Sequence, residues 1–404
     1  MKDLSPQASV SHSPTSRLLR MLLSLLAGAI GGTITGLLVS HIITRHAHSD
    51  YRAHAKMASL AVDPGAIYGH FLYFVTVARA AGWSADIHRI LDATPFVLGA
   101  AIGIAIVVAQ QLVRSLAGIT GTRSGALPEV GIALTVVALF FSFSLPTTTN
   151  YIGQFPPMVW HNSTVLFLMP FAIGLYFATL KMLERPTRWL VGLVMLLVAL
   201  NVAAKPSFVL AWIPAVPLFA VVNRLNRRAI VTSIVTSLYA LALIGVQSHY
   251  IFHSAASARL YKIMDIQVTG VKIVPFYVWN VYSDNQLFSL LASNVLTLTA
   301  VAVYRRKLLS WQQFQLAACL YVVGLAIWIL FSMQGSAAFA ADFLWQMVPC
   351  TMLMFLTVVA YFWKELLLRG RLRATDGAVV IALVVQVAAF VRYIDIYLTT
   401  GAYR

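Results

Sequence analysis

The sequence predicts an all-α fold, a polytopic membrane helix bundle with about eleven transmembrane helices. The first supporting observation is composition. Of the 404 residues, 60% are hydrophobic and only 10% are charged, and the mean hydropathy is +0.81. A soluble domain carries roughly 25% charged residues, so this chain has too few charges to cover its apolar surface in water. The second observation is that the apolar residues form runs of about 20, the length that crosses a bilayer as a helix.

The expected fifth and sixth helices are short, because Lys205 and Pro206 separate them. Pro206 lacks an amide hydrogen and suits a helix start, so we expect a tight turn there at the outer surface. If the pair is instead a re-entrant hairpin, the count falls to about nine. The expected spans are 18–44, 93–113, 128–146, 163–182, 189–204, 207–223, 229–247, 286–304, 312–333, 344–363 and 377–398.

Glycines spaced four residues apart occur in the first two expected helices. They are Gly28, Gly32 and Gly36 in the first, and Gly99 and Gly103 in the second. This spacing is typical of close contact between membrane helices, and packing alone explains it.

Lys and Arg residues in the loops predict the orientation of the bundle. With the N-terminus in the cytoplasm every inner loop is basic, and most carboxylates fall on or near the outer face. We therefore predict a single transmembrane domain over residues 1–404. It has a cytoplasmic tail at 1–17, a first outer loop at 45–92 with helices lying in the interface, and a third outer loop at 248–285. None of these segments is large enough for a separate soluble domain.

Several classes of protein are excluded by what the sequence lacks. The net charge of +16 is distributed over the loops and follows no nucleic-acid-binding motif, so we expect no nucleic acid partner. Cys319 and Cys350 are far apart and form neither a disulfide framework nor a zinc motif. Phosphate-binding loops and soluble hydrolase motifs are absent. Because the inner loops are short, any activated donor must be carried by a lipid.

The strongest candidate motif is Ser49-Asp50-Tyr51-Arg52-Ala53-His54, directly after the first expected span. In a helix Asp50 and His54 lie four residues apart on one face. A carboxylate and an imidazole so placed could act as a proton-transfer pair or as two metal ligands. The alternative is a solvated turn capped by Ser49 or Asp50.

Two further motifs could bind an anion. Trp160-His161-Asn162 leads into the fourth expected span, where Asn162 can cap the helix and His161 lies near its positive end. Lys205 between two apolar spans is costly unless it reaches water or a partner. Arg259 in the third outer loop could join them. The alternatives are an interfacial Trp160 anchor, a snorkelling Lys205 and a solvated loop.

An outer first loop that opens with an Asp, as in Ser49-Asp50-Tyr51-x-x-His54, resembles the GT-C superfamily of integral membrane glycosyltransferases. Trp160-His161-Asn162-x-Thr164 and Lys205-Pro206-Ser207 resemble multi-pass bacterial members. The resemblance covers the topology and about the first half of the chain. Many members have paired acidic residues, whereas here Ser49 and Tyr51 flank Asp50. This departure leaves the subfamily and a requirement for a divalent metal open.

The resemblance implies a glycosyltransferase of the bacterial plasma membrane, with its active site on the periplasmic or extracellular face. Its partners would be a polyprenyl-phosphate-linked sugar, a glycan or lipid-linked acceptor, and membrane lipids. Asp50 would be the general base and His54 would orient it. The assigned binding residues are His161, Lys205 and Arg259 for the donor phosphate, and Tyr51, Asn162 and Trp160 for the acceptor or sugar.

Other functions remain open. An O-antigen-type polymerase or ligase usually relies on several arginines in a large outer loop, and here that loop offers Arg259. A transporter or flippase of lipid-linked glycans often shows internal repeats, and no repeat is evident. A membrane acyltransferase finds no support in the placement of the histidines.

Overall fold

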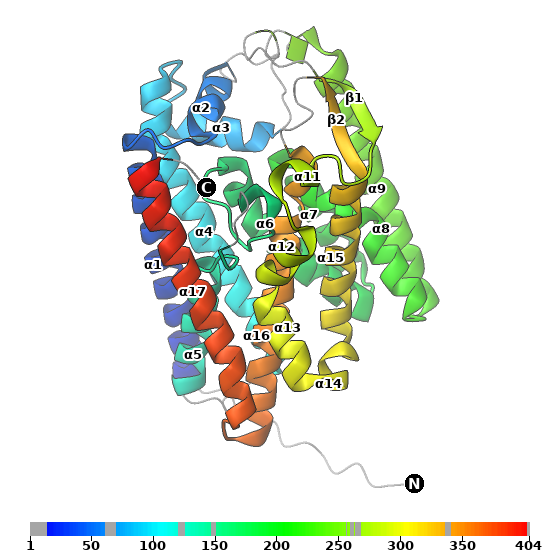
Figure 1. Cartoon of the computed structure of the whole chain (residues 1–404). Helices are drawn as coiled ribbons and strands as arrows, with labels where there is room; N and C mark the ends of the chain where they lie inside the picture. Colours follow the sequence, from blue (N-terminus) through cyan, green and yellow to red (C-terminus); the bar gives the residue numbers. More distant parts are fainter. Residues whose placement is uncertain are drawn as a thin grey trace.

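The computed structural model describes residues 14–60, 70–119, 126–146, 151–255, 257–258, 262, 268–335 and 341–401. Within these residues the secondary structure is helical apart from one small antiparallel sheet (Figure 1). The first half contains α1 (Pro14–Thr44), α2 (Tyr51–Leu60), α3 (Phe71–Ala80), α4 (Ile87–Ala117), α5 (Ala126–Phe140), η1 (Tyr151–Gly153), α6 (Ser163–Glu184), α7 (Arg188–Ala204), α8 (Ser207–Val222) and α9 (Arg227–His253). The second half contains β1 (Val268–Ile273), α11 (Trp279–Tyr282), α12 (Gln286–Ser293), α13 (Val295–Tyr304), α14 (Arg306–Leu309), α15 (Gln312–Leu330), β2 (Phe331–Gly335), η3 (Asp342–Leu344), α16 (Met347–Arg369) and α17 (Ala374–Thr400).

Seven helices in the described part of the chain are long and apolar enough to cross a membrane. They are α1, α4, α6, α9, α15, α16 together with η3, and α17. This confirms an α-helical membrane protein. The expected count of about eleven is not reached by length alone. An eighth span would combine α12 and α13, which meet at Asn294 and are bent by 68°. The three remaining expected spans correspond to the shorter helices α5, α7 and α8.

The connection between α7 and α8 differs from the sequence-based expectation. The chain does break at Lys205 and Pro206, as predicted, and Pro206 precedes the first residue of α8. The turn is however enclosed by protein rather than solvated, because Ala204 is fully buried and Lys205 is only 5% exposed. The turn is buried because the lysine side chain finds partners inside the bundle, which are described below.

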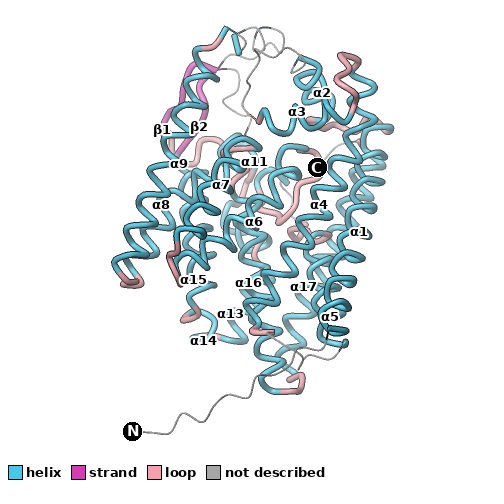
Figure 2. Tube along the Cα trace, turned by 180° about the vertical axis from the view of Figure 1, so that it is seen from behind, coloured by secondary structure: helices cyan, strands magenta, loops and turns pink. Residues whose placement is uncertain are grey.

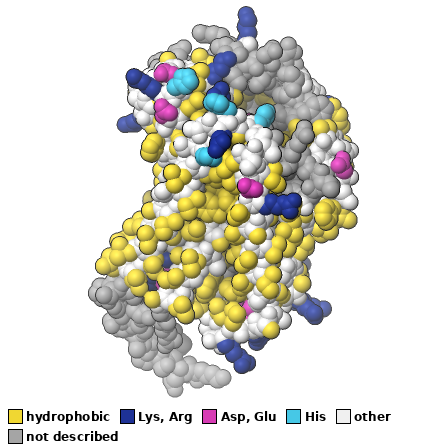
Figure 3. Space-filling model, turned by 60° about the vertical axis from the view of Figure 1, so that its left-hand side comes forward, with side chains coloured by type: hydrophobic (Ala, Val, Ile, Leu, Met, Phe, Trp, Pro, Cys, Tyr) yellow, Lys and Arg dark blue, Asp and Glu magenta, His cyan; other side chains and the backbone are white. Residues whose placement is uncertain are grey.

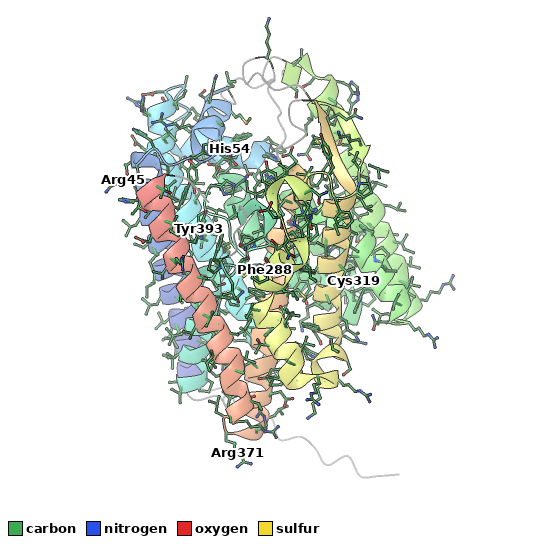
Figure 4. All side chains as sticks on the ribbon, in the orientation of Figure 1. Arg45, His54, Phe288, Cys319, Arg371 and Tyr393 are labelled. Carbon is green, nitrogen blue, oxygen red and sulfur yellow. The ribbon has the colours of Figure 1, made fainter. Side chains whose placement is uncertain are left out.

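The helices place charged residues at two opposite ends of the bundle. Arg45, which follows α1, and Arg371, between α16 and α17, lie at these opposite ends (Figure 4). We call the end with α2, α3 and the turn 45–50 the Asp50 end. The end with the turns after α6, α8, α13 and α16 is called the basic end. Figure 3 shows a broad apolar surface with His, Lys, Arg and acidic side chains gathered above it and further Lys and Arg below. Such a belt is the surface that lipid chains cover.

The described residues of the segment 45–92 form α2 and α3 and the start of α4. The expected interfacial helix at 71–75 corresponds to α3, while the other expected stretch, at 66–68, lies outside the described residues. α2 and α3 contact each other and the start of α4, at the Asp50 end (Figure 1). The small sheet lies at the same end (Figure 2). In it β1 pairs antiparallel with β2, which continues directly from α15. The sheet was not predicted, because the expected span 312–333 assigns Phe331, Ser332 and Met333 to the end of a helix, whereas they belong to β2.

The glycines of α1 and α4 lie at a close crossing of the two helices. A Cβ atom on Gly32 would come within 2.6 Å of the Gly99 carbonyl oxygen, and one on Gly28 within 2.8 Å of the Gly103 oxygen. Larger residues would therefore push the helices apart, which confirms the packing interpretation. The same small residues leave an apolar groove of about 950 Å³ along the outside of the crossing.

A buried ion pair joins three helices near the basic end. The Arg114 guanidinium of α4 donates from Nε to Oε2 of Glu129 in α5 at 2.7 Å, and from Nη1 to the Ser24 hydroxyl of α1 at 2.5 Å. Arg114 is 4% exposed and Glu129 is 2% exposed. Because both charges are removed from water, each depends on the other for compensation.

We expect Glu129→Gln to destabilise the protein by about 3 kcal/mol, because it leaves the Arg114 charge buried without its counter-charge. Thermal or denaturant unfolding in detergent measures the loss. The matched control is Glu184→Gln, which breaks an exposed pair with Lys181 at 3.6 Å and should cost about 0–1 kcal/mol. Equal losses in the two variants would contradict the structural role of the buried pair.

Candidate functional site

The turn between α1 and α2 carries Asp50 and is held at three points. The backbone amide of His48 donates to the Gly401 carbonyl at 2.9 Å, and the Tyr397 hydroxyl donates to the His48 carbonyl at 2.8 Å. The Asp50 amide donates to the His161 carbonyl at 3.0 Å. The end of α17 and the segment before α6 therefore fix the position of Asp50.

The Asp50 carboxylate accepts one hydrogen bond from α6. Asn162 Nδ2 donates to Asp50 Oδ2 at 2.9 Å. Asn162 also caps α6, since its Oδ1 accepts from the Val165 amide at 3.1 Å and from the Thr164 hydroxyl at 2.8 Å. These bonds orient the NH₂ group of Asn162 towards Asp50.

The environment of Asp50 raises its basicity. Asp50 is partly buried, and burial raises its pKa to about 6, although the positive charge of Lys205 acts in the opposite direction. A carboxylate with a pKa near 6 is largely ionised at neutral pH and still binds a proton more readily than an exposed Asp. These are the properties that a general base requires.

His54 lies one helical turn after Asp50, and its backbone amide donates to the Asp50 carbonyl at 2.8 Å. Its Nδ1 lies 2.6 Å from the Ser163 hydroxyl, and its ring packs against Tyr73 and Phe74. Burial lowers the pKa of His54 to about 3, so the ring is neutral. Asp50 thus contacts Asn162, and His54 contacts the next residue, Ser163. The hydrogen bond to the Asp50 carboxylate comes from Asn162 and not from His54.

Lys205 supplies a buried positive charge. Its Nζ donates to the Thr164 hydroxyl at 2.9 Å and lies 5.7 Å from the centre of the Trp345 ring. Within the described residues Lys205 forms no direct ion pair with a carboxylate. Burial lowers its pKa to about 8, while the charges of Asp342 and Asp50 act in the opposite direction. At neutral pH the ammonium is therefore mostly charged.

His161 is buried beside this charge. It is 2% exposed, and its ring lies 5.5 Å from the Trp345 ring. Burial lowers the pKa of His161 to about 3. The imidazole is therefore neutral at neutral pH, because desolvation disfavours the imidazolium, and the assignment of His161 to the donor phosphate stays a prediction. His161 can still offer a hydrogen bond.

Asp342 provides the open side of this group. It begins η3, its side chain is exposed, and its charge acts on both Asp50 and Lys205. Asp50 and His54 are partly buried, whereas Lys205 lies deeper. The group therefore combines an exposed acidic residue, a partly buried Asp50 and a buried cation.

The structure brings together five of the predicted site residues: Asp50, His54, His161, Asn162 and Lys205. They come from three segments that are distant in sequence. We call these residues together with Thr164 and Asp342 the Asp50 cluster. Figure 4 shows His54 within the Asp50 end of the bundle.

Three predicted site residues do not fit their assigned role or are not described. Tyr51 is 1% exposed and donates its hydroxyl to the Trp160 carbonyl at 2.5 Å. Trp160 is fully buried and stacks on Phe141. Neither ring offers a face to a sugar, so their assignment to the acceptor or sugar is corrected to a core role. Arg259 lies outside the described residues.

Two residues of the site were missed by sequence reasoning. They are Asp342, whose charge acts on Lys205, and Trp345, whose ring lies beside the Lys205 ammonium. No local pattern marks them, because their proximity to Lys205 results from the packing of α16 against α4, α6 and α8. A lone acidic residue before an apolar helix was the one available signal.

No group of three or more His, Cys, Asp or Glu side chains with the geometry of a metal site is found among the described residues. The apolar groove beside α1 includes neither Asp50 nor Lys205 in its lining. Comparison of the chain with protein-family models and with curated proteins finds no match. The functional interpretation therefore depends on the geometry of the Asp50 cluster.

Proposed function

We propose that this protein is a membrane glycosyltransferase that moves a sugar from a polyprenyl-phosphate donor to a hydroxyl of a glycan or lipid-linked acceptor. The observation that carries the proposal is the convergence of Asp50 and Lys205 at one end of an apolar bundle. One is a base with a pKa near 6, and the other is a buried cation without a direct carboxylate partner. Acid–base chemistry next to an anion site, within reach of lipid, suits a donor that is a lipid phosphate.

The proposed reaction is a displacement at the anomeric carbon. The Asp50 carboxylate takes the proton of the acceptor hydroxyl, and the acceptor oxygen forms a bond to the anomeric carbon. The bond between that carbon and the phosphate oxygen breaks, and its electron pair stays on the departing polyprenyl phosphate. Lys205 stabilises the negative charge that develops there. Asn162 holds Asp50 by its hydrogen bond at 2.9 Å, and Thr164 holds Lys205.

The topology that this proposal needs follows from the two ends of the bundle. The turns of the basic end carry clusters such as Arg227-Arg228 and Arg305-Arg306-Lys307. We infer that this end faces the cytoplasm, because basic loops stay on that side. The Asp50 end is then outside, in the periplasmic or extracellular space of a bacterial plasma membrane. In this arrangement α5, α7, α8 and the α12–α13 pair complete the proposed eleven spans.

A second candidate, a flippase of lipid-linked glycans, is favoured by a different feature. The bend of 68° between α12 and α13 interrupts a span, and interrupted helices are common at the binding sites of transporters. Asn294 at the bend donates to the Leu290 carbonyl and to the Tyr321 hydroxyl. These two bonds engage the side-chain NH₂ group of Asn294 without a transported ligand, so the transferase is preferred.

The two candidates are separated by supplying membranes that contain the protein with polyprenyl phosphates bearing radiolabelled sugars. The transferase is expected to move the label into an acceptor fraction that membranes without the protein do not label. Movement of the intact donor between leaflets with no labelled product would favour the flippase instead.

The proposed roles predict a bell-shaped dependence of the transfer rate on pH. Asp50 works only when deprotonated, so the rate should rise with pH through about 6. Lys205 works only when protonated, so the rate should fall through about 8. Rates measured with wild-type protein and Lys205→Arg test this. The alkaline limb should move to higher pH in the variant, because an arginine stays protonated. An unchanged alkaline limb would contradict the role of Lys205.

A further inference from the structure

A second polar site lies at the basic end, away from the Asp50 cluster. The turn between α6 and α7 meets the turn between α8 and α9, and together they surround a pocket of about 500 Å³. The second of these turns is at the lower right edge of the bundle in Figure 1. The pocket is lined by Arg185, Pro186, Thr187, Asn226, Arg227 and Arg228.

The charge of this pocket is uncompensated. In the part of the chain that the structure describes, Arg185, Arg227 and Arg228 form no ion pair with a carboxylate. The adjacent Glu184 is instead paired with Lys181 at 3.6 Å. Three guanidinium groups around one hollow suit a phosphate group, because each can donate two parallel hydrogen bonds to its oxygens.

The helix ends add to this positive field. α7 begins at Arg188 after its cap Thr187, and α9 begins at Arg227 after its cap Asn226. Each cap side chain accepts one amide, from Leu190 and Ala229 respectively. Because both caps line the pocket, the positive ends of the two helix dipoles lie beside it.

The surroundings of the pocket indicate where its anion comes from. Exposed apolar side chains follow directly along the helices, with Trp189 75% exposed and Val222 68% exposed. A tryptophan at this level is typical of the membrane interface. The apolar surface continues along α8 and α9 through Leu218, Val221, Val231 and Val235, each about half exposed. An anion bound among the arginines can thus be the headgroup of a lipid whose acyl chains cover this surface.

We propose that this pocket binds the phosphate headgroup of an anionic phospholipid, with the acyl chains lying on the exposed faces of α8 and α9. The net positive charge selects a lipid with net negative charge over a zwitterionic one. The site is independent of the proposed transferase chemistry, since it lies at the other end of the bundle.

The proposal is tested by native mass spectrometry of the purified full-length protein in detergent, titrated with phosphatidylglycerol, phosphatidylcholine or inorganic phosphate. Wild-type protein should retain phosphatidylglycerol in preference to phosphatidylcholine, and free phosphate should not displace it at equal concentration. The triple variant Arg185→Gln/Arg227→Gln/Arg228→Gln should bind phosphatidylglycerol on the order of 100-fold more weakly, because each basic residue beside an anionic lipid contributes roughly fivefold.

The matched control removes the same number of charges from another turn of the basic end, as Arg305→Gln/Arg306→Gln/Lys307→Gln. It should change phosphatidylglycerol binding little. Equal weakening in both triple variants would show diffuse attraction and overturn the site. Equal binding of the two lipids by wild-type protein would also overturn it, and so would displacement by free phosphate. The wild-type comparison stays decisive even if the pocket variant does not fold.

Discussion

Asp50→Asn is expected to slow sugar transfer by roughly 10²–10⁴-fold, the usual contribution of a general base. The variant keeps the shape of the side chain, and its amide oxygen can still accept the hydrogen bond that Asn162 now donates to Asp50 Oδ2. Folding and membrane insertion should therefore be preserved. The loss should appear in the initial rate at saturating donor, because the base acts in the chemical step.

The control for this variant is Asp395→Asn. Asp395 is an exposed residue on α17 at the same end of the bundle, and among the described residues its carboxylate forms no ion pair. Its replacement should leave the rate unchanged. If Asp50→Asn is folded, inserted and fully active, the assignment of Asp50 as the base is wrong.

Lys205→Met is expected to lower the transfer rate by about 10²–10³-fold, the usual effect of removing one preorganised group that stabilises charge in a transition state. The methionine fills a similar volume without burying a charge, so the bundle should fold. Thr164 keeps its hydrogen bond to Asn162. The rate is measured with purified protein at several donor concentrations.

A second readout of Lys205→Met separates an electrostatic role from a packing role. The Lys205 charge holds the pKa of Asp50 down. Its removal should therefore move the acid limb of the pH profile above 6. Lys272→Met removes a lysine that lies over the Tyr277 ring at the same end and should move neither the rate nor the limb. An unchanged acid limb in Lys205→Met would contradict coupling between the two charges.

The positions of the membrane helices could be predicted from the sequence, because a run of about 20 apolar residues favours an apolar environment over water. The run 93–113 lies within α4, and the break at Pro206 follows from its missing amide hydrogen. Hydropathy does not distinguish lipid from protein as the apolar environment, so it did not show that the Lys205 turn is buried. The bend at Asn294 was missed for a similar reason, since the expected span 286–304 is mostly apolar on both sides of it.

The candidate site could be predicted only in part. Asp50, Asn162 and Lys205 each stood out as polar residues beside apolar spans, and the fold brings them together. The burial of Trp160 was not predictable, because an aromatic residue in a loop fits an interfacial anchor or a core equally well. The contact between Trp345 and Lys205 joins residues that are distant in sequence, and no local periodicity carries such information.

The most direct measurement is the release of polyprenyl phosphate by purified protein in liposomes supplied with a labelled polyprenyl-phosphate sugar and a mixed pool of hydroxyl acceptors. If the Asp50 cluster performs glycosyl transfer, one polyprenyl phosphate should be freed for each label that enters an acceptor, and both should nearly vanish in Asp50→Asn. Release of neither product by the wild-type protein, together with movement of the intact donor across the bilayer, would contradict a transferase and identify a flippase.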